Sequence, residues 1–222
     1  MNNLNILYED NHIIVVVKPV NILSQQDNTK DIDMLTMIKE YLKNKYQKPG
    51  NVFLGLVHRL DRVVGGVMVF AKTSKAASRL SDAIRKNEVH KEYLVVCHGK
   101  LKIHDVLVDY LEKKSDFNTI ISTKEKGKMA ELSYDLIHYD DKRNLSLAKV
   151  NLKTGRHHQI RVQFSSRNYP LFGDSRYGID KEKNIGLFAY KLSFVHPVKT
   201  EEMIFTYLPT SKPFNLFDIK NI

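Results

Sequence analysis

The pattern of apolar and polar positions changes along the chain and predicts where strands form. Two apolar or β-branched runs, residues 4–8 and 12–17, are separated by Glu9-Asp10-Asn11, which predicts a hairpin. Lys18-Pro19 ends the second run, because proline cannot continue a central ladder. Similar runs predict further strands over residues 66–71, 91–96, 187–194 and 203–207.

Other segments follow helical spacing. Met34, Leu35, Ile38, Tyr41 and Leu42 predict a helix that Pro49-Gly50 closes. A second helix is predicted to be capped by Ser74, with Ala77, Leu80 and Ile84 on one face. Residues 154–166 are typical of a turn that enters a short helix.

The middle of the chain, residues 106–152, has mostly period two, with charged turns at Lys113-Lys114 and over residues 124–128. This pattern predicts an antiparallel meander. Strands outnumber helices and do not alternate regularly with them, which favours an α+β fold with a largely antiparallel sheet. Without a repeat or a linker, residues 1–222 are expected to form one domain.

Charge is the composition feature that changes this picture. The chain carries 35 Lys and Arg against 25 acidic residues, a net charge of +10. Such an excess favours a polyanionic partner, and a solvated basic surface explains it equally well. No leader-like segment and no apolar run of about 20 residues stand out, so we expect a cytoplasmic protein without a membrane partner. The single cysteine, Cys97, excludes an intramolecular disulfide and is expected to be a buried hydrophobe.

Two short segments concentrate the polar side chains that could do chemistry. The first, residues 57–66, places Asp61 between Arg59 and Arg62, close to His58. Nearby positive charge favours an ionised carboxylate, so Asp61 is expected to act as a nucleophile or a base. A structural Asp–Arg salt bridge at a strand edge is the competing interpretation.

The second segment, residues 152–163, contains two arginines, two histidines and two glutamines. Arg156, Gln159 and Gln163 recur at helical spacing and could line one polar face toward phosphates or bases, or form a solvated face. The adjacent His157 and His158 are expected on different sides of a helix, so they cannot share one metal ion in the usual i, i+4 manner.

Several nucleotide-binding and hydrolase motifs are absent from the sequence: GxxxxGK[ST], GxGxxG and GxSxG. A reaction driven by one carboxylate without a cofactor remains, and residue types alone do not name it.

Six elements in order resemble the RluA-type pseudouridine synthases. The two strongest are His58-Arg59-Leu60-Asp61-Arg62, which is similar to the HRLD signature, and residues 154–161, which are similar to the TGRxHQIR signature. The lesser elements are Lys18-Pro19, Lys91-Glu92-Tyr93 with Gly99, Tyr169-Pro170-Leu171 with Gly173-Asp174 and Tyr177-Gly178, and His196-Pro197. The resemblance covers nearly the whole chain, from about residue 6 to about residue 207.

The resemblance implies an enzyme that isomerises uridine to pseudouridine in transfer RNA or ribosomal RNA. It implies a mixed, largely antiparallel sheet split by a basic active-site cleft that holds a flipped uridine. Asp61 would be the nucleophile, Arg161 would hold its carboxylate, and Tyr93 would stack on the base. Arg59 would fill the space that the extruded nucleotide leaves. Neither metal nor organic cofactor is implied, and we expect a monomer. Further RNA contacts are expected from His58, Arg62, Arg156, His158 and Gln159.

Three departures from the family pattern bear on these expectations. Val64-Gly65 stands where the family has Thr-Ser, so two hydroxyls near Asp61 are lost. Asn21 replaces a glycine, and the turn is expected to survive because Asn tolerates positive φ. The chain is also expected to work without an S4-type RNA-binding domain. An RNA-binding protein that has lost the reaction is the alternative from another functional class.

Overall fold

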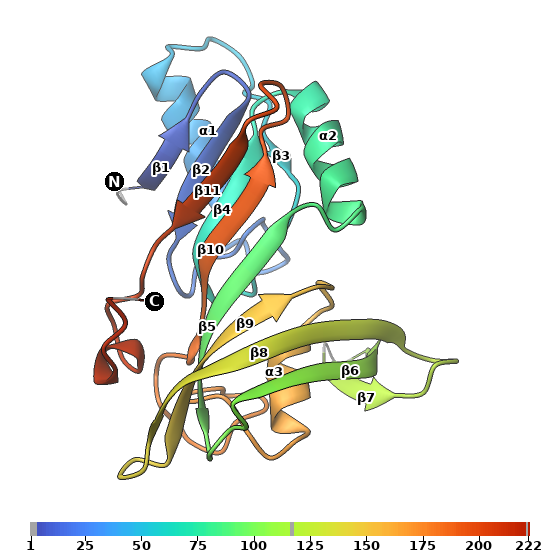
Figure 1. Ribbon diagram of the computed structural model, residues 1–222. Coiled ribbons are helices and arrows are strands. Elements are labelled where there is room, and N and C mark those ends of the chain that lie inside the picture. The colour runs from blue at the N-terminus through green and yellow to red at the C-terminus, as the bar shows by residue number, and fades with distance from the viewer. Residues whose placement is uncertain (1–3, 116–117, 221) are drawn as a thin grey trace. The chain divides into compact units, whose positions relative to one another are not determined.

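The computed structural model describes residues 4–115, 118–220 and 222. They divide into two compact units: unit 1 lies within residues 1–89 and 191–207, and unit 2 within residues 90–190 and 208–222. Figure 1 labels the helices and strands of both units. The expectation of one catalytic domain over residues 1–222 stays a prediction, and each unit is described by itself.

Unit 1 is built on a sheet in which β2 and β4 are central. Strand β2 pairs with β1 on one side and with β4 on the other, both in antiparallel register, and β10 follows β4 in the sheet. The short β3 also pairs with β4, and β11 pairs with the C-terminal part of β10. The elements are β1 (Asn5–Glu9), β2 (Ile13–Lys18), α1 (Met34–Lys45), β3 (Gly55–Leu56), β4 (Gly65–Ala71), α2 (Ser74–Arg85), β11 (Glu202–Thr206) and, from residue 191 onward, β10 (Leu187–Val195).

Strands β2 and β4 are buried at every position, which explains why their sequences are nearly continuous apolar runs. Val15 lies opposite Val69 in the register, and both join a core cluster with Leu80 of α2. The predicted hairpin, the predicted helix over residues 34–42 and the predicted strand over residues 66–71 are therefore confirmed.

The cap of α2 differs from the prediction by one residue. Thr73, in extended conformation, is the N-cap, and its hydroxyl accepts a hydrogen bond of 3.2 Å from the Ala76 backbone N–H. Ser74 is the first helical residue, so the predicted Ser74 cap is wrong. Threonine and serine can both act as caps, and here the Thr73 hydroxyl takes the Ala76 N–H, so the helix begins one residue earlier than predicted.

Unit 2 contains an antiparallel sheet in the order β5-β9-β8-β6-β7. The predicted meander is wrong in one respect. In a meander each strand pairs with the next one along the chain, so β7 would lie between β6 and β8. Instead β6 lies between β7 and β8, and β7 is at the edge. The register between β6 and β8 runs over eight residue pairs, so it satisfies more backbone groups than the four-residue β7 could. The elements are β5 (His90–His98), β6 (His104–Lys113), β7 (Thr119–Ser122), β8 (Lys128–Asp140), β9 (Leu145–Leu152), α3 (Gln159–Ser165) and the 3₁₀ turn η1 (Phe214–Leu216).

Helix α3 packs on one face of the sheet in unit 2. Val162 joins a buried cluster with Leu111 and Ala130, and the ring of Phe164 lies 5.4 Å from that of Tyr134, centroid to centroid. The predicted strands and the short helix after residue 154 are confirmed, as is the α+β class. Cys97 is fully buried, and burial raises the pKa of its thiol, which fits the predicted hydrophobic role. Among the described residues, no helix is long and apolar enough to cross a membrane.

Candidate active site

The predicted site residues fall into two groups, one in each unit. His58, Arg59, Asp61 and Arg62 belong to unit 1. Tyr93, Arg156, His158, Gln159 and Arg161 belong to unit 2. The geometry within each group shows how the chain positions these side chains.

Asp61 lies in the loop between β3 and β4, and buried contacts fix the residues on both sides of it. The Ser24 hydroxyl donates to the Leu60 carbonyl (2.8 Å) and accepts from the Leu60 N–H (3.1 Å). On the other side, the Lys18 ammonium donates to the Arg62 carbonyl at 3.1 Å. Anchors at both neighbours restrict the backbone of Asp61, which is what a preorganised carboxylate needs.

His58 begins this loop and fixes it to β4. Its Nε2 accepts a hydrogen bond of 3.1 Å from the Val69 backbone N–H. A ring nitrogen that accepts carries no proton, so the neutral ring has its hydrogen on Nδ1. This contact gives His58 a structural task, and its contact with RNA stays a prediction.

Lys18 is a site residue to which sequence reasoning gave no role. Its side chain is fully buried, and its ammonium donates to the carbonyls of Pro19 (2.9 Å), Ile22 (2.6 Å) and Arg62. Burial lowers the pKa of Lys18 to about 7, although the negative charge of Asp61 acts in the opposite direction. The signal in the sequence was a lysine at the end of an otherwise apolar strand.

The arginines that flank Asp61 are both exposed. Arg62 forms an ion pair of 2.7 Å with Asp31, and both side chains are about half exposed, so the pair contributes little stability. Asn21 has a φ of 63°, which confirms the expectation that asparagine preserves the turn. Val64, in place of a hydroxyl residue, is 2% exposed and therefore part of the core.

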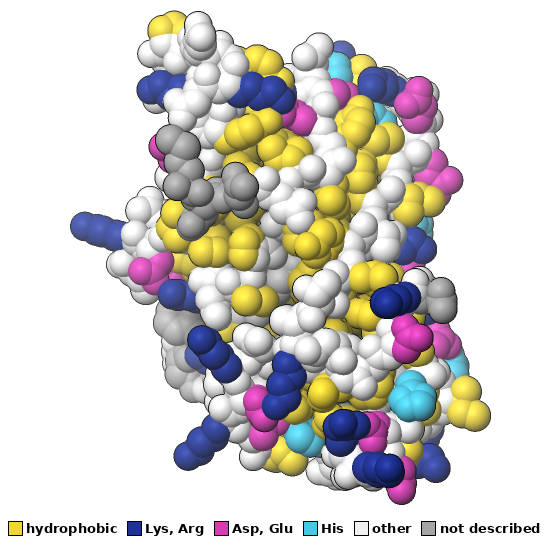
Figure 2. All heavy atoms as spheres, turned by 90° about the vertical axis from the view of Figure 1, so that its left-hand side faces the viewer, with side chains coloured by type: hydrophobic (Ala, Val, Ile, Leu, Met, Phe, Trp, Pro, Cys, Tyr) yellow, Lys and Arg dark blue, Asp and Glu magenta, His cyan; other side chains and the backbone are white. Residues whose placement is uncertain are grey.

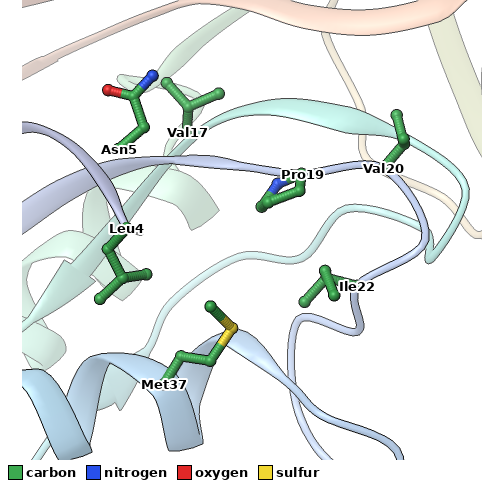
Figure 3. Close-up of a pocket in the computed structure, with 7 residues that line it drawn as sticks. All are labelled: Leu4, Asn5, Val17, Pro19, Val20, Ile22 and Met37. Carbon is green, nitrogen blue, oxygen red and sulfur yellow. The ribbon is translucent and has the colours of Figure 1, made fainter. Parts of the chain in front are cut away.

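An apolar pocket of about 360 Å³ is lined in part by Val17, Pro19, Val20 and Ile22, the residues around Lys18 in the chain (Figure 3). Pro19 and Ile22 line it, and their carbonyls accept hydrogen bonds from Lys18. Its lining contains no titratable side chain and none of the predicted site residues. The lining residues are Leu4, Asn5, Val17, Pro19, Val20, Ile22 and Met37.

In unit 2, Arg161 is buried and held by a carboxylate. It is 4% exposed, and it donates from Nε to Asp174 Oδ2 (2.8 Å) and from Nη2 to Asp174 Oδ1 (2.6 Å). Burial acts to raise the pKa of Asp174, but the hydrogen bonds and the charge of Arg161 outweigh it and hold that pKa below its usual value. Asp174 belongs to one of the lesser elements of the family resemblance, but the sequence predicted no role for it. Its two hydrogen bonds with Arg161 are therefore a finding of the structure.

Tyr177 supports the same arginine from another side. Its ring centroid lies 5.2 Å from the guanidinium carbon of Arg161, and its hydroxyl accepts from the Thr119 N–H at 2.9 Å. That hydroxyl also lies 2.8 Å from Nδ1 of His158. The Asp174 carboxylate and the Tyr177 ring thus fix the plane of the guanidinium. Tyr93 lies on β5 and is 6% exposed, and its stacking on a base stays a prediction.

The prediction that His157 and His158 lie on different sides of a helix is wrong. His157 and His158 precede α3, and His158 has a left-handed φ of 51° as its N-cap. This backbone conformation breaks the helical period, so the two rings stack with centroids 3.7 Å apart and planes 27° apart. The described residues contain no group of three or more His, Cys, Asp or Glu residues arranged to hold a metal ion.

The prediction that Arg156, Gln159 and Gln163 line one polar face of a helix is also wrong. Arg156 precedes the helix and donates from Nε to the Met129 carbonyl, while Gln159 and Gln163 are buried. Oε1 of Gln159 accepts from the Thr154 hydroxyl (2.8 Å) and from the Arg156 N–H (3.0 Å), so this glutamine braces the turn. Helical spacing alone could not show that the side-chain amide of Gln159 is buried and bonds to backbone groups. The RNA contacts of Arg156, His158 and Gln159 stay predictions.

The basic character of the chain is distributed rather than confined to these loops. Figure 2 shows one face of the molecule, on which Lys and Arg side chains stand among hydrophobic, acidic and uncharged groups.

Sequence comparison identifies the family. The model of the RNA pseudouridylate synthase family matches residues 12–166. An uncharacterized RNA pseudouridine synthase of Bacillus subtilis, YhcT, is 31% identical over 93% of this chain and 68% of its own length. Ribosomal large subunit pseudouridine synthase D of Vibrio cholerae is 32% identical over 91% of this chain and 66% of its own length.

Solved structures agree on the fold. Human RNA pseudouridylate synthase domain containing 1 has a TM-score of 0.74 at 21% identity, covering 94% of this chain and 84% of its own. Human RNA pseudouridylate synthase domain containing 4 has a TM-score of 0.76 at 20% identity, covering 92% and 88%. The predicted pseudouridine synthase fold is confirmed. The chain belongs to the RluA-type family of RNA pseudouridine synthases, which are isomerases.

Proposed function

We propose that this chain isomerises specific uridines of structured RNA to pseudouridine, with Asp61 as the nucleophile. The observation that carries the proposal is the anchoring of the Asp61 loop. Ser24 fixes Leu60 on one side, and Lys18 fixes Arg62 on the other. A carboxylate held between two buried anchors has little freedom to lose when it reacts.

The reaction conserves all atoms of the nucleotide. Attack by the Asp61 carboxylate, on the base or on the sugar, leads to cleavage of the bond between N1 of uracil and C1′ of ribose. The base then turns, C5 bonds to C1′, C5 loses its proton and N1 gains one. Because the uracil must leave its stack first, the enzyme must bind an extruded nucleotide.

We assign two further catalytic roles in unit 2. Tyr93 offers an aromatic face on which a flipped base can stack. Arg161 supplies a guanidinium whose plane Asp174 and Tyr177 already fix, and we propose that it stabilises the negative charge of the reacting carboxylate. Arg59, which is exposed, is proposed to occupy the place of the extruded base in the RNA.

Large-subunit ribosomal RNA is the first substrate class that we propose. Several similar proteins, including the one from Vibrio cholerae, are named ribosomal large subunit pseudouridine synthases. Transfer RNA is the second class to test. Both present uridines in loops, from which a base can be extruded at lower cost than from a duplex.

Release of tritium from RNA labelled at uridine C5 tests the function directly, because forming the new bond at C5 expels that hydrogen. Transcripts of large-subunit ribosomal RNA and of transfer RNA are incubated with the pure protein. We expect release from at least one class. Absence of release from both, by folded protein that still binds RNA, would favour the binding-only alternative.

Asp61→Asn separates chemistry from recognition, because asparagine keeps the shape of the side chain and loses its charge. We expect tritium release to fall by at least about a thousandfold, while the affinity for the same transcript changes little. Unchanged release in this variant would refute Asp61 as the nucleophile.

A further inference from the structure

Lys91 is a partly buried cation on β5 without a structural explanation. Its ammonium has no hydrogen-bond or ion-pair partner among the residues that the structure describes, and burial alone lowers its pKa. Three other cations with little exposed side-chain surface have such partners: Lys18 has three carbonyls, Arg161 has Asp174, and Lys72 has Glu9. Removing a charge from water without a compensating contact costs stability. Stabilisation of the fold therefore does not explain why a lysine stands at this position.

The surroundings of Lys91 in unit 2 indicate a use for it. Lys91 and Tyr93 are two residues apart on one strand, so both side chains belong to the same face of the sheet. The Lys91 ammonium also lies beside Gly155, where an added Cβ would be 3.6 Å from Nζ and would meet no other described atom within 4 Å. The space over the Gly155 backbone is therefore open, and a lysine charge borders it.

We propose that Lys91 binds a backbone phosphate of the RNA, which approaches over Gly155. A glycine without a side chain lets a ligand come close to the backbone, and lysine binds phosphate as a point charge. The proposal rests on the proposed function only in taking RNA as the ligand. A phosphate would also supply the anion that the described residues do not offer to this ammonium.

Salt dependence of RNA binding tests the proposal without requiring turnover. Wild type, Lys91→Met and Lys91→Arg are titrated with one large-subunit ribosomal RNA transcript at several salt concentrations. Loss of one phosphate contact should make the negative slope of log K against log salt shallower by about 0.7 to 0.9 in Lys91→Met, whereas Lys91→Arg keeps the wild-type slope. On a transcript that releases tritium, KM should rise about tenfold in Lys91→Met with nearly unchanged kcat.

A second readout separates a binding lysine from a structural one. Lys91→Met should unfold at an equal or higher urea concentration than wild type, because the substitution removes a desolvated charge. The control is Lys142→Met, which deletes an exposed charge in the same unit and should leave both the slope and the unfolding midpoint nearly unchanged.

Three outcomes would overturn the proposal: an unchanged salt slope in Lys91→Met, an equally shallow slope in Lys142→Met, or a clear loss of stability in Lys91→Met. A shallower slope in Lys91→Met together with no tritium release by wild type would contradict the proposed function alone and leave the phosphate contact supported.

Discussion

At the scale of single residues, the ion pair of Arg161 and Asp174 bears on both the stability of the fold and the orientation of a proposed catalytic residue. Both side chains are almost fully buried, and two parallel hydrogen bonds connect them. A buried ion pair stabilises little against a well-packed apolar pair, but removal of one partner leaves an uncompensated charge. The pair is therefore better explained as a device that orients Arg161 than as a source of stability.

Asp174→Asn should lower the free energy of unfolding by about 3 kcal/mol or more, because the buried guanidinium loses its counter-charge. The control is Asp140→Asn, which breaks the pair with Arg143, whose side chain is 53% exposed, and should cost less than about 1 kcal/mol. Urea unfolding of both variants measures the difference. Equal losses in the two variants would show that burial of the Arg161 pair carries no special penalty.

The residues of the candidate site differ in how well the sequence predicts them. Asp61, Tyr93 and Arg161 stand in recognisable motifs, so their positions could be predicted, and their roles stay proposals. Lys18 and Asp174 could not be given roles from the sequence. Their functions depend on carbonyls and a guanidinium that folding brings close, from 44 residues away for Lys18 and Arg62 and from 13 away for Asp174 and Arg161.

At the scale of elements, apolar runs predicted most strands because β2 and β4 are buried on both faces. The order of the strands in unit 2 was less accessible. Period two indicates that a segment is a strand, but it does not say which neighbour the strand pairs with, and β6 pairs with both β7 and β8. Similarly, helical spacing over residues 156–163 could not show that His158 adopts a left-handed conformation before the helix begins.

The start of α2 provides a direct test at this scale. Thr73→Ala should lower the free energy of unfolding by about 1 kcal/mol, because the Ala76 N–H loses its hydroxyl acceptor. Ser74→Ala should be nearly neutral, since Ser74 is exposed and is not the cap. Urea unfolding of the two single variants compares them. A larger loss in Ser74→Ala would contradict the observed cap and restore the one predicted from the sequence.

At the scale of the whole molecule, charge couples stability to pH in two separate ranges. Burial acts to raise the pKa of Glu9, but hydrogen bonds from Lys45, Lys72, Tyr46 and Tyr41 lower it to about 2. The stability that this carboxylate contributes is present above its ordinary pKa of 4.5 and is lost as pH falls toward 2. Carboxylates of this kind no longer titrate above neutral pH, which leaves the range from pH 7 to 9 for groups such as Lys18.

Lys18 should make the protein more stable as pH rises from 7 to 9. Its pKa is about 7 in the folded chain and 10.5 ordinarily, so between these values the unfolded chain binds more protons. Stability then increases with pH by at most about 1.4 kcal/mol per unit, or about 2 kcal/mol over the range. Urea unfolding of wild type and Lys18→Met at pH 7, 8 and 9 measures this slope, and the difference between the two proteins removes the contribution of other groups. Lys18→Met is expected to be less stable overall, because three buried carbonyls lose their donor. Only the slope tests the titration: parallel curves for the two proteins would show that Lys18 stays charged throughout this range.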